Sequence, residues 1–425
     1  MPSPIPIRPL LAPPDCSVVV PGSKSHTNRA LVCAALARGE SRLTGALLAD
    51  DTEAMLSALG ALRVPITREG TTLTVSGRGG ALDVRGVTVD CRQSGTTSRF
   101  LLPALSLAAG PNTLDGHPQL RARPFGPLID ALAQLGVPLQ GEGLPLVVPG
   151  GGLPGGAARV GGDVSSQLLS GLLLSAPLAA GAVTVAVDGA LVSRPYVELT
   201  LATMRAFGAE VSSDGATWTV APTGYRGAAL TIEPDASAAS YFFAAAAITG
   251  GRVRVEGLGA STLQGDLAFV DVLEAMGASV VRGADFTEVT GPARLRGVEV
   301  DMGDISDTAQ TLAAVAPFAD SPTRVTGIGF IRAKETDRVG AVVRELQRLG
   351  VDAREEPDGF LIRPGVPSPA VVQTYEDHRM AMSFALIGLR AEGIQVADPG
   401  CVAKTFPDYF TALEGLRSSI GQKKA

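Results

Sequence analysis

The sequence predicts a mixed α/β (α+β) protein of two domains, each assembled from three similar units. Three observations predict this class. The chain has 425 residues, which is too long for one ordinary hydrophobic core. Hydrophobic residues make up 45% of it and charged residues only 18%, as in well-packed globular proteins. The third observation is an internal repeat that mixes helical and strand-like segments along the whole chain.

Each repeat is marked by a helical stretch that ends in an apolar residue, a glycine and a small or apolar residue, and that leads into a strand. Glycine suits the end of a helix because it adopts the left-handed backbone conformation there. Successive glycines are 76, 72, 69 and 73 residues apart. The five marks are Leu59-Gly60-Ala61, Leu135-Gly136-Val137, Phe207-Gly208-Ala209, Met276-Gly277-Ala278 and Leu349-Gly350-Val351. A sixth, degenerate copy is expected at Tyr409 to Leu416.

Six such units account for the whole chain, so three units per domain is the simplest division. A proline interrupts the pattern at Glu233-Pro234-Asp235, about halfway along the chain. A second crossover between the domains is expected near Pro21-Gly22. The predicted first domain is therefore residues 1–21 with 235–425, and the predicted second domain is residues 22–234.

The charge and the cysteines exclude several classes of protein. The net charge of −6 argues against a nucleic-acid partner, which would call for a broad basic face, but it allows a local basic pocket for a small anion. The four cysteines form no CxxC pair, so we expect neither a disulfide framework nor a zinc site, and a reducing cytoplasm is the default location. Met1 to Pro14 lacks the basic start and apolar core of a signal peptide.

The longest uncharged run, Val164 to Val187, is long enough to suggest a membrane span. It contains Pro177 and Gly181, however, and its end alternates like a strand. We therefore expect a buried helix followed by a strand, and no membrane partner.

Lysine is rare in this chain. Arginine occurs 31 times and lysine five times, and only Lys24, Lys334 and Lys404 lie outside the C-terminal tail. A compact ammonium group on a flexible stem can move protons and fit where a guanidinium cannot. Since all three lysines also fall inside dense polar motifs, they are candidate functional residues.

Polar motifs stand where helices are expected to begin in the N-terminal half. The first, Val20 to Arg29, runs from a strand through Pro-Gly into a helix and crowds hydroxyls, a lysine and an arginine at the helix start, which favours an anion. Ordinary N-capping by Ser23 or Ser25 is the simpler alternative, but it leaves Lys24 and Arg29 unexplained. Four weaker motifs are Gln93-Ser-Gly-Thr-Thr-Ser-Arg99, Arg121-Ala-Arg123-Pro124, Gly162-Asp-Val-Ser-Ser-Gln167 and Leu191-Val-Ser-Arg-Pro-Tyr196.

The C-terminal half carries denser signals. Its motifs are Ser306-Asp-Thr-Ala-Gln310, Lys334-Glu-Thr-Asp-Arg338, Tyr375-Glu-Asp-His-Arg-Met-Ala-Met382 and Lys404-Thr-Phe-Pro-Asp-Tyr-Phe410. They combine cations with a few carboxylates, and the chain has no HExxH motif, no nucleophile elbow and no GxGxxG after a strand. This set suits substrates that carry phosphate and carboxylate groups, with proton transfer and without a metal or other cofactor.

Taken in order, these motifs resemble those of the 5-enolpyruvylshikimate-3-phosphate synthase family of enolpyruvyl transferases, from about residue 20 to residue 410. The resemblance implies two domains of three βαβαββ-type units each, in an inside-out α/β barrel with helices inside and sheets outside. It also implies the reaction, in which phosphoenolpyruvate and shikimate 3-phosphate give 5-enolpyruvylshikimate 3-phosphate and phosphate. The motifs that carry it are Pro21-Gly-Ser-Lys-Ser, Asn28-Arg29, Ser94-Gly-Thr-Thr, Arg99, Arg123-Pro124, Ser165-Ser-Gln167, Lys334-Glu-Thr-Asp-Arg338, Asp377-His-Arg-Met380 and Lys404-Thr-Phe-Pro-Asp408.

The resemblance also implies which residues contact each substrate. The shikimate 3-phosphate contacts would be Lys24, Ser25, Arg29, Ser165, Ser166, Gln167, Ser193, Tyr196, Asp307 and Lys334. The phosphoenolpyruvate contacts would be Lys24, Gly95, Arg123, Gln167, Arg338, Arg379 and Lys404. Arginine forks suit such groups because two parallel N–H bonds fix the plane of a carboxylate or phosphate. We expect these small molecules as the only partners, a monomeric protein, and domains that close on the ligands.

The family mechanism is addition followed by elimination. Asp307 is the candidate base for the 5-hydroxyl, while Glu335 and Lys24 are both candidates for delivering and recovering the C3 proton. Two positions depart from the family pattern. Gln93 stands where relatives often have asparagine, and Phe330 stands where some relatives place an asparagine that contacts the shikimate phosphate.

Two other functions are compatible with parts of this pattern. The sister family that transfers enolpyruvate to UDP-N-acetylglucosamine usually carries a reactive cysteine in the loop before its Arg-Pro pair, but Pro111 to Arg123 has none. A non-catalytic anion-binding protein would need the arginines but not Asp307, Glu335 and the three lysines. The motifs therefore favour the shikimate enzyme.

Overall fold

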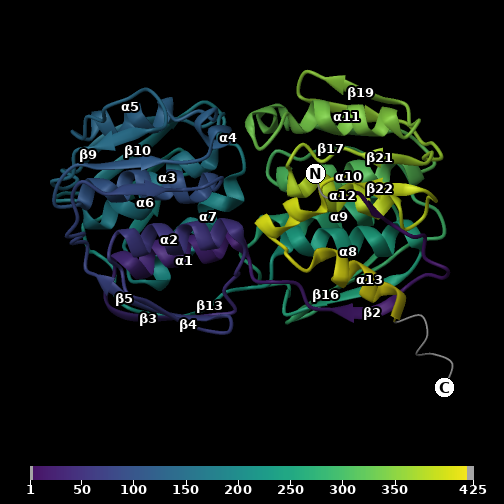
Figure 1. Cartoon of the computed structure of the whole chain (residues 1–425), viewed down its shortest axis with the longest axis horizontal. Helices are drawn as coiled ribbons and strands as arrows, with labels where there is room; N and C mark the ends of the chain where they lie inside the picture. The colour runs from purple at the N-terminus through teal and green to yellow at the C-terminus, as the bar shows by residue number, and fades with distance from the viewer. Residues whose placement is uncertain (1–2, 419–425) are drawn as a thin grey trace. The chain divides into compact units, whose positions relative to one another are not determined.

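The computed structural model describes residues 3–418, which fold as a mixed α/β protein. The chain divides into two compact units (Figure 1). We call Gly22–Glu233 the continuous unit, and Met1–Pro21 together with Pro234–Ala425 the split unit. This division places Pro234 in the split unit, one residue away from the predicted boundary.

The continuous unit alternates short helices and strands. Its α-helices are α1 (Lys24–Leu36), α2 (Asp50–Ala61), α3 (Gly95–Ala104), α4 (Pro118–Arg121), α5 (Gly126–Gln134), α6 (Ser166–Ser175) and α7 (Arg194–Ala206). Its strands are β3 (Arg38–Thr44), β4 (Ile66–Glu69), β5 (Thr72–Arg78), β6 (Thr88–Asp90), β7 (Asn112–Asp115), β8 (Leu146–Val148), β9 (Gly156–Gly161), β10 (Val183–Asp188), β11 (Val211–Ser213), β12 (Thr217–Val220) and β13 (Ala229–Thr231).

The split unit has the same alternation. Its α-helices are α8 (Ala236–Thr249), α9 (Phe269–Ala275), α10 (Ala309–Val315), α11 (Arg338–Arg348), α12 (His378–Ile387) and α13 (Tyr409–Ser418). Its strands are β1 (Ile5–Pro6), β2 (Asp15–Val18), β14 (Arg252–Glu256), β15 (Ser279–Arg282), β16 (Phe286–Thr290), β17 (Glu299–Asp301), β18 (Thr323–Thr326), β19 (Ala353–Glu356), β20 (Gly359–Ile362), β21 (Ala370–Val372) and β22 (Ile394–Val396). Short 3-10 turns that carry site residues are η4 (Ser306–Thr308), η6 (Gly329–Ala333) and η7 (Pro399–Lys404).

The described residues form six small mixed sheets with one shared pattern, in which a parallel pair is extended on one side by antiparallel strands. Four sheets have four strands, in the orders β13-β3-β5-β4, β9-β10-β12-β11, β2-β14-β16-β15 and β17-β18-β20-β19. The other two have three strands, in the orders β6-β7-β8 and β21-β22-β1. Six sheets of one pattern are what a chain of six similar units should produce.

Two strands lie outside the unit of the helix that follows them. β2 precedes α1 in the chain but pairs with β14 of the split unit, and β13 precedes α8 but pairs with β3 of the continuous unit. The backbone is fixed at both changes of unit, since Ser23 N donates to Glu233 O and Asp235 N donates to Pro21 O, each over 2.8 Å. The chain therefore crosses between the units twice, immediately before α1 and immediately before α8.

Three helices in each unit are buried nearly all round. They are α1, α3 and α6 in the continuous unit, and α8, α10 and α12 in the split unit. Within each set the helices pack on one another (Figure 1). Small residues allow this close approach, and a Cβ atom at Gly171 of α6 would lie only 2.2 Å from the carbonyl oxygen of Arg99 in α3.

The uncharged run at Val164–Val187 folds as predicted, into α6 and then β10. Over residues 3–418, every helix is too short or too polar to span a bilayer.

The first repeat mark was assigned wrongly. Gly60 lies inside α2, and the residue with left-handed backbone after this helix is Arg63, at φ 58°. In the other four marks the glycine itself has positive φ, between 77° and 107°. An arginine occupies the position where the other repeats have glycine, three residues after the predicted mark. Measured from Arg63 to Gly136, the first spacing becomes 73 residues.

Candidate active site

The buried helices of the continuous unit all begin with a serine N-cap. Ser23 Oγ accepts from His26 N over 3.4 Å, and both Ser94 Oγ and Ser165 Oγ accept from the second or third helical N–H over 3.3 Å. A neutral cap satisfies one N–H group but leaves the positive end of the helix dipole uncompensated. These helix starts therefore favour an added anion, which is the interpretation given above to the Val20–Arg29 motif.

Hydrogen bonds join these helix starts to each other. Asn28 Nδ2 of α1 donates to Thr96 Oγ1 of α3 over 2.7 Å, and Arg99 Nη1 of α3 donates to Gln167 Oε1 of α6 over 2.9 Å. The N-terminal ends of α1, α3 and α6 therefore lie side by side, and three of the predicted motifs meet at one end of the unit.

Arg29 lies inside this helix cluster. Its guanidinium donates to Thr200 Oγ1 over 2.7 Å and to the carbonyl oxygens of Ser25 and Tyr196 over 2.9 and 3.0 Å, and it stacks over Phe100 at 5.0 Å. Burial lowers the pKa of Arg29 to about 10, although Tyr196 acts in the opposite direction. In this structure the side chain thus links α1 to α7 and holds the backbone of two predicted substrate contacts.

Lys24 is paired with a carboxylate that the sequence gave no reason to select. Its Nζ lies 3.3 Å from Asp51 Oδ2, at the start of α2. The lysine side chain is 13% exposed and that of the aspartate 4%, so the pair is largely shielded from water. The contact with the carboxylate fixes the position of the ammonium group.

Three polar side chains approach the backbone of Gly95, which has no side chain of its own. A Cβ atom there would lie 2.7 Å from Arg123 Nη1, 2.9 Å from Arg99 Nη1 and 3.5 Å from Gln167 Oε1. The glycine is therefore required for this approach of side chains to the backbone. The structure brings together Gly95, Arg123 and Gln167, all of which the motifs had placed at one substrate.

Strained backbone marks the borders of several motifs. Arg92, Ser193, Tyr375 and Glu376 have positive φ values of 49°, 52°, 55° and 56°. Such a conformation costs a non-glycine residue roughly 1–2 kcal/mol, and it accumulates at functional sites. Ser193 stands at the start of α7, three residues before Tyr196, while Ser166 is the first residue of α6.

In the split unit, Arg338 lies among three carboxylates. Its Nε donates to Asp377 Oδ2 over 2.8 Å, its Nη1 to Asp307 Oδ1 over 3.2 Å, and its Nη2 to Glu335 Oε2 over 2.8 Å. The arginine is 2% exposed. Burial alone would lower its pKa, but Asp377, Glu335 and Asp307 together raise it above the ordinary value, so the guanidinium is permanently charged.

Arg379 binds Asp307, one of the two aspartates that also contact Arg338. Its Nη2 donates to Asp307 Oδ2 over 2.5 Å and its Nη1 to the carbonyl oxygen of Asp307 over 3.0 Å. Asp377 caps α12 by accepting from Arg379 N over 2.9 Å. The carboxylate of Asp307 therefore bridges two guanidiniums, one from α11 and one from α12.

The two remaining lysines lie in the same unit. Lys334 follows η6, and its Nζ lies 5.6 Å from the centre of the Phe330 ring, a cation–π distance. Lys404 ends η7 and is 5% exposed. Phe330, one of the two residues that depart from the family pattern, thus contacts the side chain of a predicted shikimate 3-phosphate contact. At the other departure, Gln93 Nε2 lies 3.4 Å from His117 Nδ1.

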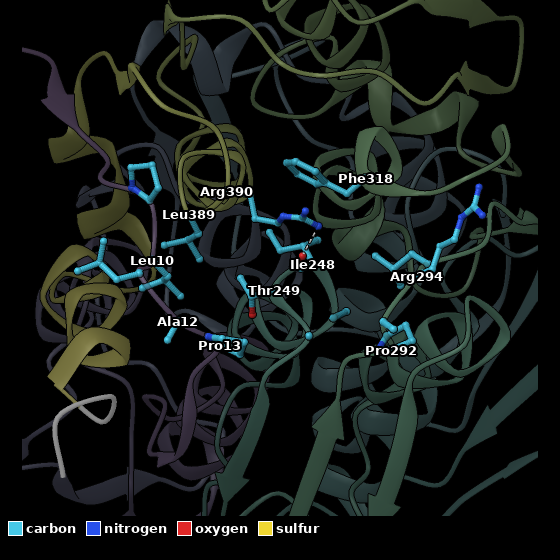
Figure 2. Close-up of a pocket in the computed structure, with 16 residues that line it drawn as sticks. Leu10, Ala12, Pro13, Ile248, Thr249, Pro292, Arg294, Phe318, Leu389 and Arg390 are labelled. Atoms are coloured by element: carbon cyan, nitrogen blue, oxygen red, sulfur yellow. Dashed lines mark hydrogen bonds between the residues drawn. The ribbon is translucent and has the colours of Figure 1, made fainter. Parts of the chain in front are cut away.

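A well-formed cavity of the split unit is lined by other residues. It has a volume of about 560 Å³ and is lined by Pro9–Pro13, by the C-terminal end of α8 and by residues after α12 (Figure 2). There Arg390 donates to Ile248 O over 2.7 Å and stacks on Phe318. None of the predicted site residues lines this cavity. The candidate site is therefore identified from the charges and hydrogen bonds of its residues and not from the volume of a cavity. Among residues 3–418 there is also no cluster of three or more potential metal ligands.

His26 makes the stability of the fold depend on pH. It is 2% exposed, and within the described chain its Nδ1 has no hydrogen-bond partner. Burial lowers its pKa from 6.5 to about 4, with Glu233 partly opposing this and Arg29 adding to it. Between these two values the folded protein binds fewer protons than the unfolded chain, so the free energy of unfolding falls as the pH falls.

We expect that at pH 5 His26 contributes a loss of about 2 kcal/mol in the free energy of unfolding relative to pH 7.5. Urea unfolding of the wild type and of His26→Gln at both pH values measures it. The variant should lose that much less stability on acidification, and an equal loss in both proteins would contradict the assignment.

The protein family described as EPSP synthase (3-phosphoshikimate 1-carboxyvinyltransferase) matches residues 13–413. The chain belongs to this family. It is 46% identical over 415 residues to the 3-phosphoshikimate 1-carboxyvinyltransferase of Nostoc sp., with 96% of this chain and 98% of the relative covered. It is 44% identical over 412 residues to 3-phosphoshikimate 1-carboxyvinyltransferase 2 of Halalkalibacterium halodurans, with 95% and 92% covered.

A solved structure of EPSP synthase from Acinetobacter baumannii has the same fold, with a TM-score of 0.83 and 26% sequence identity, and the match covers 97% of this chain and 98% of that one. The family predicted from the motifs is therefore confirmed. As an EPSP synthase family member, this chain has three polar residues near the site that the sequence did not single out as site residues: Arg99, Asp51 and Asp377. Arg99 and Asp377 stood inside quoted motifs, whereas Asp51 resembled an ordinary acidic residue in a first helical turn.

Proposed function

We propose that this chain transfers the enolpyruvyl group of phosphoenolpyruvate to the 5-hydroxyl of shikimate 3-phosphate and releases phosphate, in the shikimate pathway of aromatic amino-acid biosynthesis. One observation carries the proposal. The family match extends over residues 13–413, and the relatives that bear the name of this enzyme match over nearly their whole length. The activity is thus that of a 3-phosphoshikimate 1-carboxyvinyltransferase.

The shikimate 3-phosphate contacts proposed from the motifs are divided between the two units. Lys24, Ser25, Arg29, Ser165, Ser166, Gln167, Ser193 and Tyr196 belong to the continuous unit, and Asp307 and Lys334 belong to the split unit. The adjacent starts of α1 and α6 support the first group, because serine hydroxyls and free N–H groups at helix ends suit a phosphate. Neither unit alone carries the full set, so the proposal requires both for activity.

The phosphoenolpyruvate contacts are proposed to be Lys24, Gly95, Arg123, Gln167, Arg338, Arg379 and Lys404. The approach of Arg123 Nη1 and of the Gln167 amide to Gly95 supports the first part of this set, since it places a guanidinium and an amide side by side. The second part is supported by the two guanidiniums of Arg338 and Arg379, which already hold one carboxylate between them.

Asp307 is the proposed base for the 5-hydroxyl. In the addition step the hydroxyl oxygen bonds to C2 of the enol, Asp307 takes the hydroxyl proton, and C3 gains a proton to become a methyl group. In the elimination step the C2–O bond to phosphate breaks and C3 loses a proton, which restores the double bond. The reaction is balanced without a redox partner. The addition moves two protons, one from the 5-hydroxyl and one to C3, and the elimination moves one, from C3.

The contacts of Asp307 connect substrate binding to this role. Its carboxylate is bound by Arg338 and Arg379 over 3.2 and 2.5 Å, and these are the arginines proposed for phosphoenolpyruvate. An arriving carboxylate or phosphate would compete for the same N–H groups. We infer that phosphoenolpyruvate displaces Asp307 from them, which leaves the aspartate free to accept a proton.

Glu335 and Lys24 both stay candidates for the C3 proton. Glu335 Oε2 is held by Arg338 over 2.8 Å, and Lys24 is held by Asp51 over 3.3 Å. An oppositely charged partner thus holds each of the two groups in place, and each group can deliver or recover the proton.

The fold is proposed to be an inside-out α/β barrel with three βαβαββ repeats in each domain, the first formed by residues 1–21 with 235–425 and the second by 22–234. Support comes from the burial of three helices in each unit and from the common pattern of the six sheets. The cytoplasmic location, the monomeric state and the absence of a cofactor stay predictions.

Phosphate release with different acceptors tests the proposed function. With phosphoenolpyruvate and shikimate 3-phosphate we expect rapid release of phosphate, and with phosphoenolpyruvate alone or with UDP-N-acetylglucosamine we expect none above background. Release with the nucleotide sugar would indicate the sister transferase. Tight binding of both ligands without any release would indicate an anion-binding protein.

Replacing Gly95 by alanine should damage the phosphoenolpyruvate site. The new Cβ would lie 2.7 and 2.9 Å from the guanidinium nitrogens of Arg123 and Arg99, so both arginines must move. We expect the KM for phosphoenolpyruvate to rise roughly 10- to 100-fold, with a much smaller change in the KM for shikimate 3-phosphate. Gly60→Ala is the control, because a Cβ there meets no atom within 4 Å. Similar increases for both substrates in Gly95→Ala would contradict the assignment.

A further inference from the structure

The amide of Gln167 is held in one orientation by a buried arginine. Arg99 Nη1 of α3 donates to Gln167 Oε1 of α6 over 2.9 Å. Arg99 is 4% exposed, so this is a charge-assisted hydrogen bond shielded from water. The carbonyl end of the amide is therefore committed to the arginine.

Arg99 is itself fixed by the segment that precedes α5. Its Nη2 donates to the carbonyl oxygen of Pro124 over 3.4 Å, and its guanidinium lies 5.4 Å from the ring centre of Phe125. The guanidinium thus joins α3, α6 and the loop that carries Arg123. Since several elements hold it, the arginine can hold the glutamine with little further loss of conformational freedom.

The other end of the amide is the one that remains for a ligand. Among the described residues, none accepts a hydrogen bond from Gln167 Nε2, whereas Gln167 Oε1 lies next to Arg99 Nη1 and Arg123 Nη1 beside Gly95. With Oε1 bound to Arg99, the end of the amide that is left for a ligand is the NH₂ group, which donates to an anion, whereas the carbonyl oxygen of a reversed amide would repel it. The orientation of this amide therefore decides whether its outer end attracts or repels an anion.

We propose that Arg99 is a positioning residue, which orients the Gln167 amide so that Nε2 donates to the anionic group of phosphoenolpyruvate beside Arg123. The inference rests on the proposed function, because that function places Gln167 and Arg123 at phosphoenolpyruvate. Arg99 acts through the glutamine and through the loop before α5, and its own Nη1 and Nη2 groups are bound to protein oxygens.

Steady-state kinetics of four proteins test this: wild type, Arg99→Met, Gln167→Ala and the double variant. Methionine keeps an apolar stem of similar length but cannot donate. We expect Arg99→Met to raise the KM for phosphoenolpyruvate about 10-fold in the wild-type background with kcat much less affected, and less than about 2-fold in the Gln167→Ala background. Arg121→Met is the matched control, because Arg121 pairs with Asp115 at the surface, and its KM should stay within about 2-fold of wild type.

A further variant tests the direction of the amide. Gln167→Glu keeps the bond to Arg99 but presents an oxygen to the anion, so it should raise the KM for phosphoenolpyruvate more than Gln167→Ala does. If Arg99→Met fails to fold, Arg99→Leu, which also cannot donate, replaces it, with its melting temperature as the check.

Equal increases from Arg99→Met in both backgrounds, or a Gln167→Glu variant that binds as well as wild type, would overturn the inference and leave the proposed function standing. A wild-type protein that releases no phosphate would overturn both.

Discussion

Asp307→Asn is expected to lower kcat by roughly 10²- to 10⁴-fold, because asparagine cannot accept the proton of the 5-hydroxyl. The KM for phosphoenolpyruvate should be unchanged or lower. In the wild type the aspartate carboxylate occupies Arg338 and Arg379, and a neutral amide competes less well for these guanidiniums. Initial rates over a range of both substrate concentrations measure the two effects separately.

Asp320→Asn is the matched control for this variant. Asp320 lies in the same unit and also pairs with an arginine, Arg294 at 3.1 Å, but that arginine is largely exposed. We expect its kcat to stay within about twofold of wild type. If Asp307→Asn retains most of its turnover, Asp307 is not the base. If it loses phosphoenolpyruvate binding instead, the inferred competition is wrong.

Arg338→Met should reduce both stability and activity. The arginine is buried and neutralises Asp377, Glu335 and Asp307, so its removal leaves three carboxylates close together without their shared partner. We expect the free energy of unfolding to fall by about 3–5 kcal/mol and turnover to be nearly lost. The deficit in stability should shrink as the pH is lowered, because protonation relieves the repulsion among the carboxylates.

Arg324→Met is the control that separates the effect of burying an ion pair from the effect of losing one. Arg324 also contacts two carboxylates, Glu356 at 2.8 Å and Glu299 at 3.1 Å, but its side chain is 45% exposed. Urea unfolding should show a loss below about 1 kcal/mol for this control. Comparable losses for both variants would mean that the buried cluster has no special role in holding the fold.

Much of the fold could be predicted because it repeats. A helix end recurs about every 70 residues, and periodicity of this kind survives in the sequence even when individual elements are short. The misplaced mark at Gly60 shows the limit of the method. A glycine at a helix end is only a preference, and at Arg63 the surrounding structure holds an arginine in the left-handed conformation. A local signal cannot reveal such an exception.

The site residues at helix starts could be predicted from the sequence. The pairs between residues far apart in the sequence could not. Ser23, Ser94 and Ser165 could be recognised from their own neighbours in the sequence. The pairing of Lys24 with Asp51 and of Arg99 with Gln167 depends on which helices pack together, which no local pattern records. Asp307 was selected as a base, but its bridging of Arg338 and Arg379 could be found only from the structure.

The most direct test of the proposed mechanism is the reaction of phosphoenolpyruvate with shikimate 3-phosphate in D₂O, followed by NMR of the product and by phosphate determination. Addition followed by elimination makes C3 a methyl group for a time, so a solvent deuteron enters there and is partly retained. We predict one phosphate per enolpyruvyl product, with deuterium in its C3 methylene group. A product formed without any deuterium at C3 would contradict the addition–elimination mechanism and the proton-transfer roles of Glu335 and Lys24.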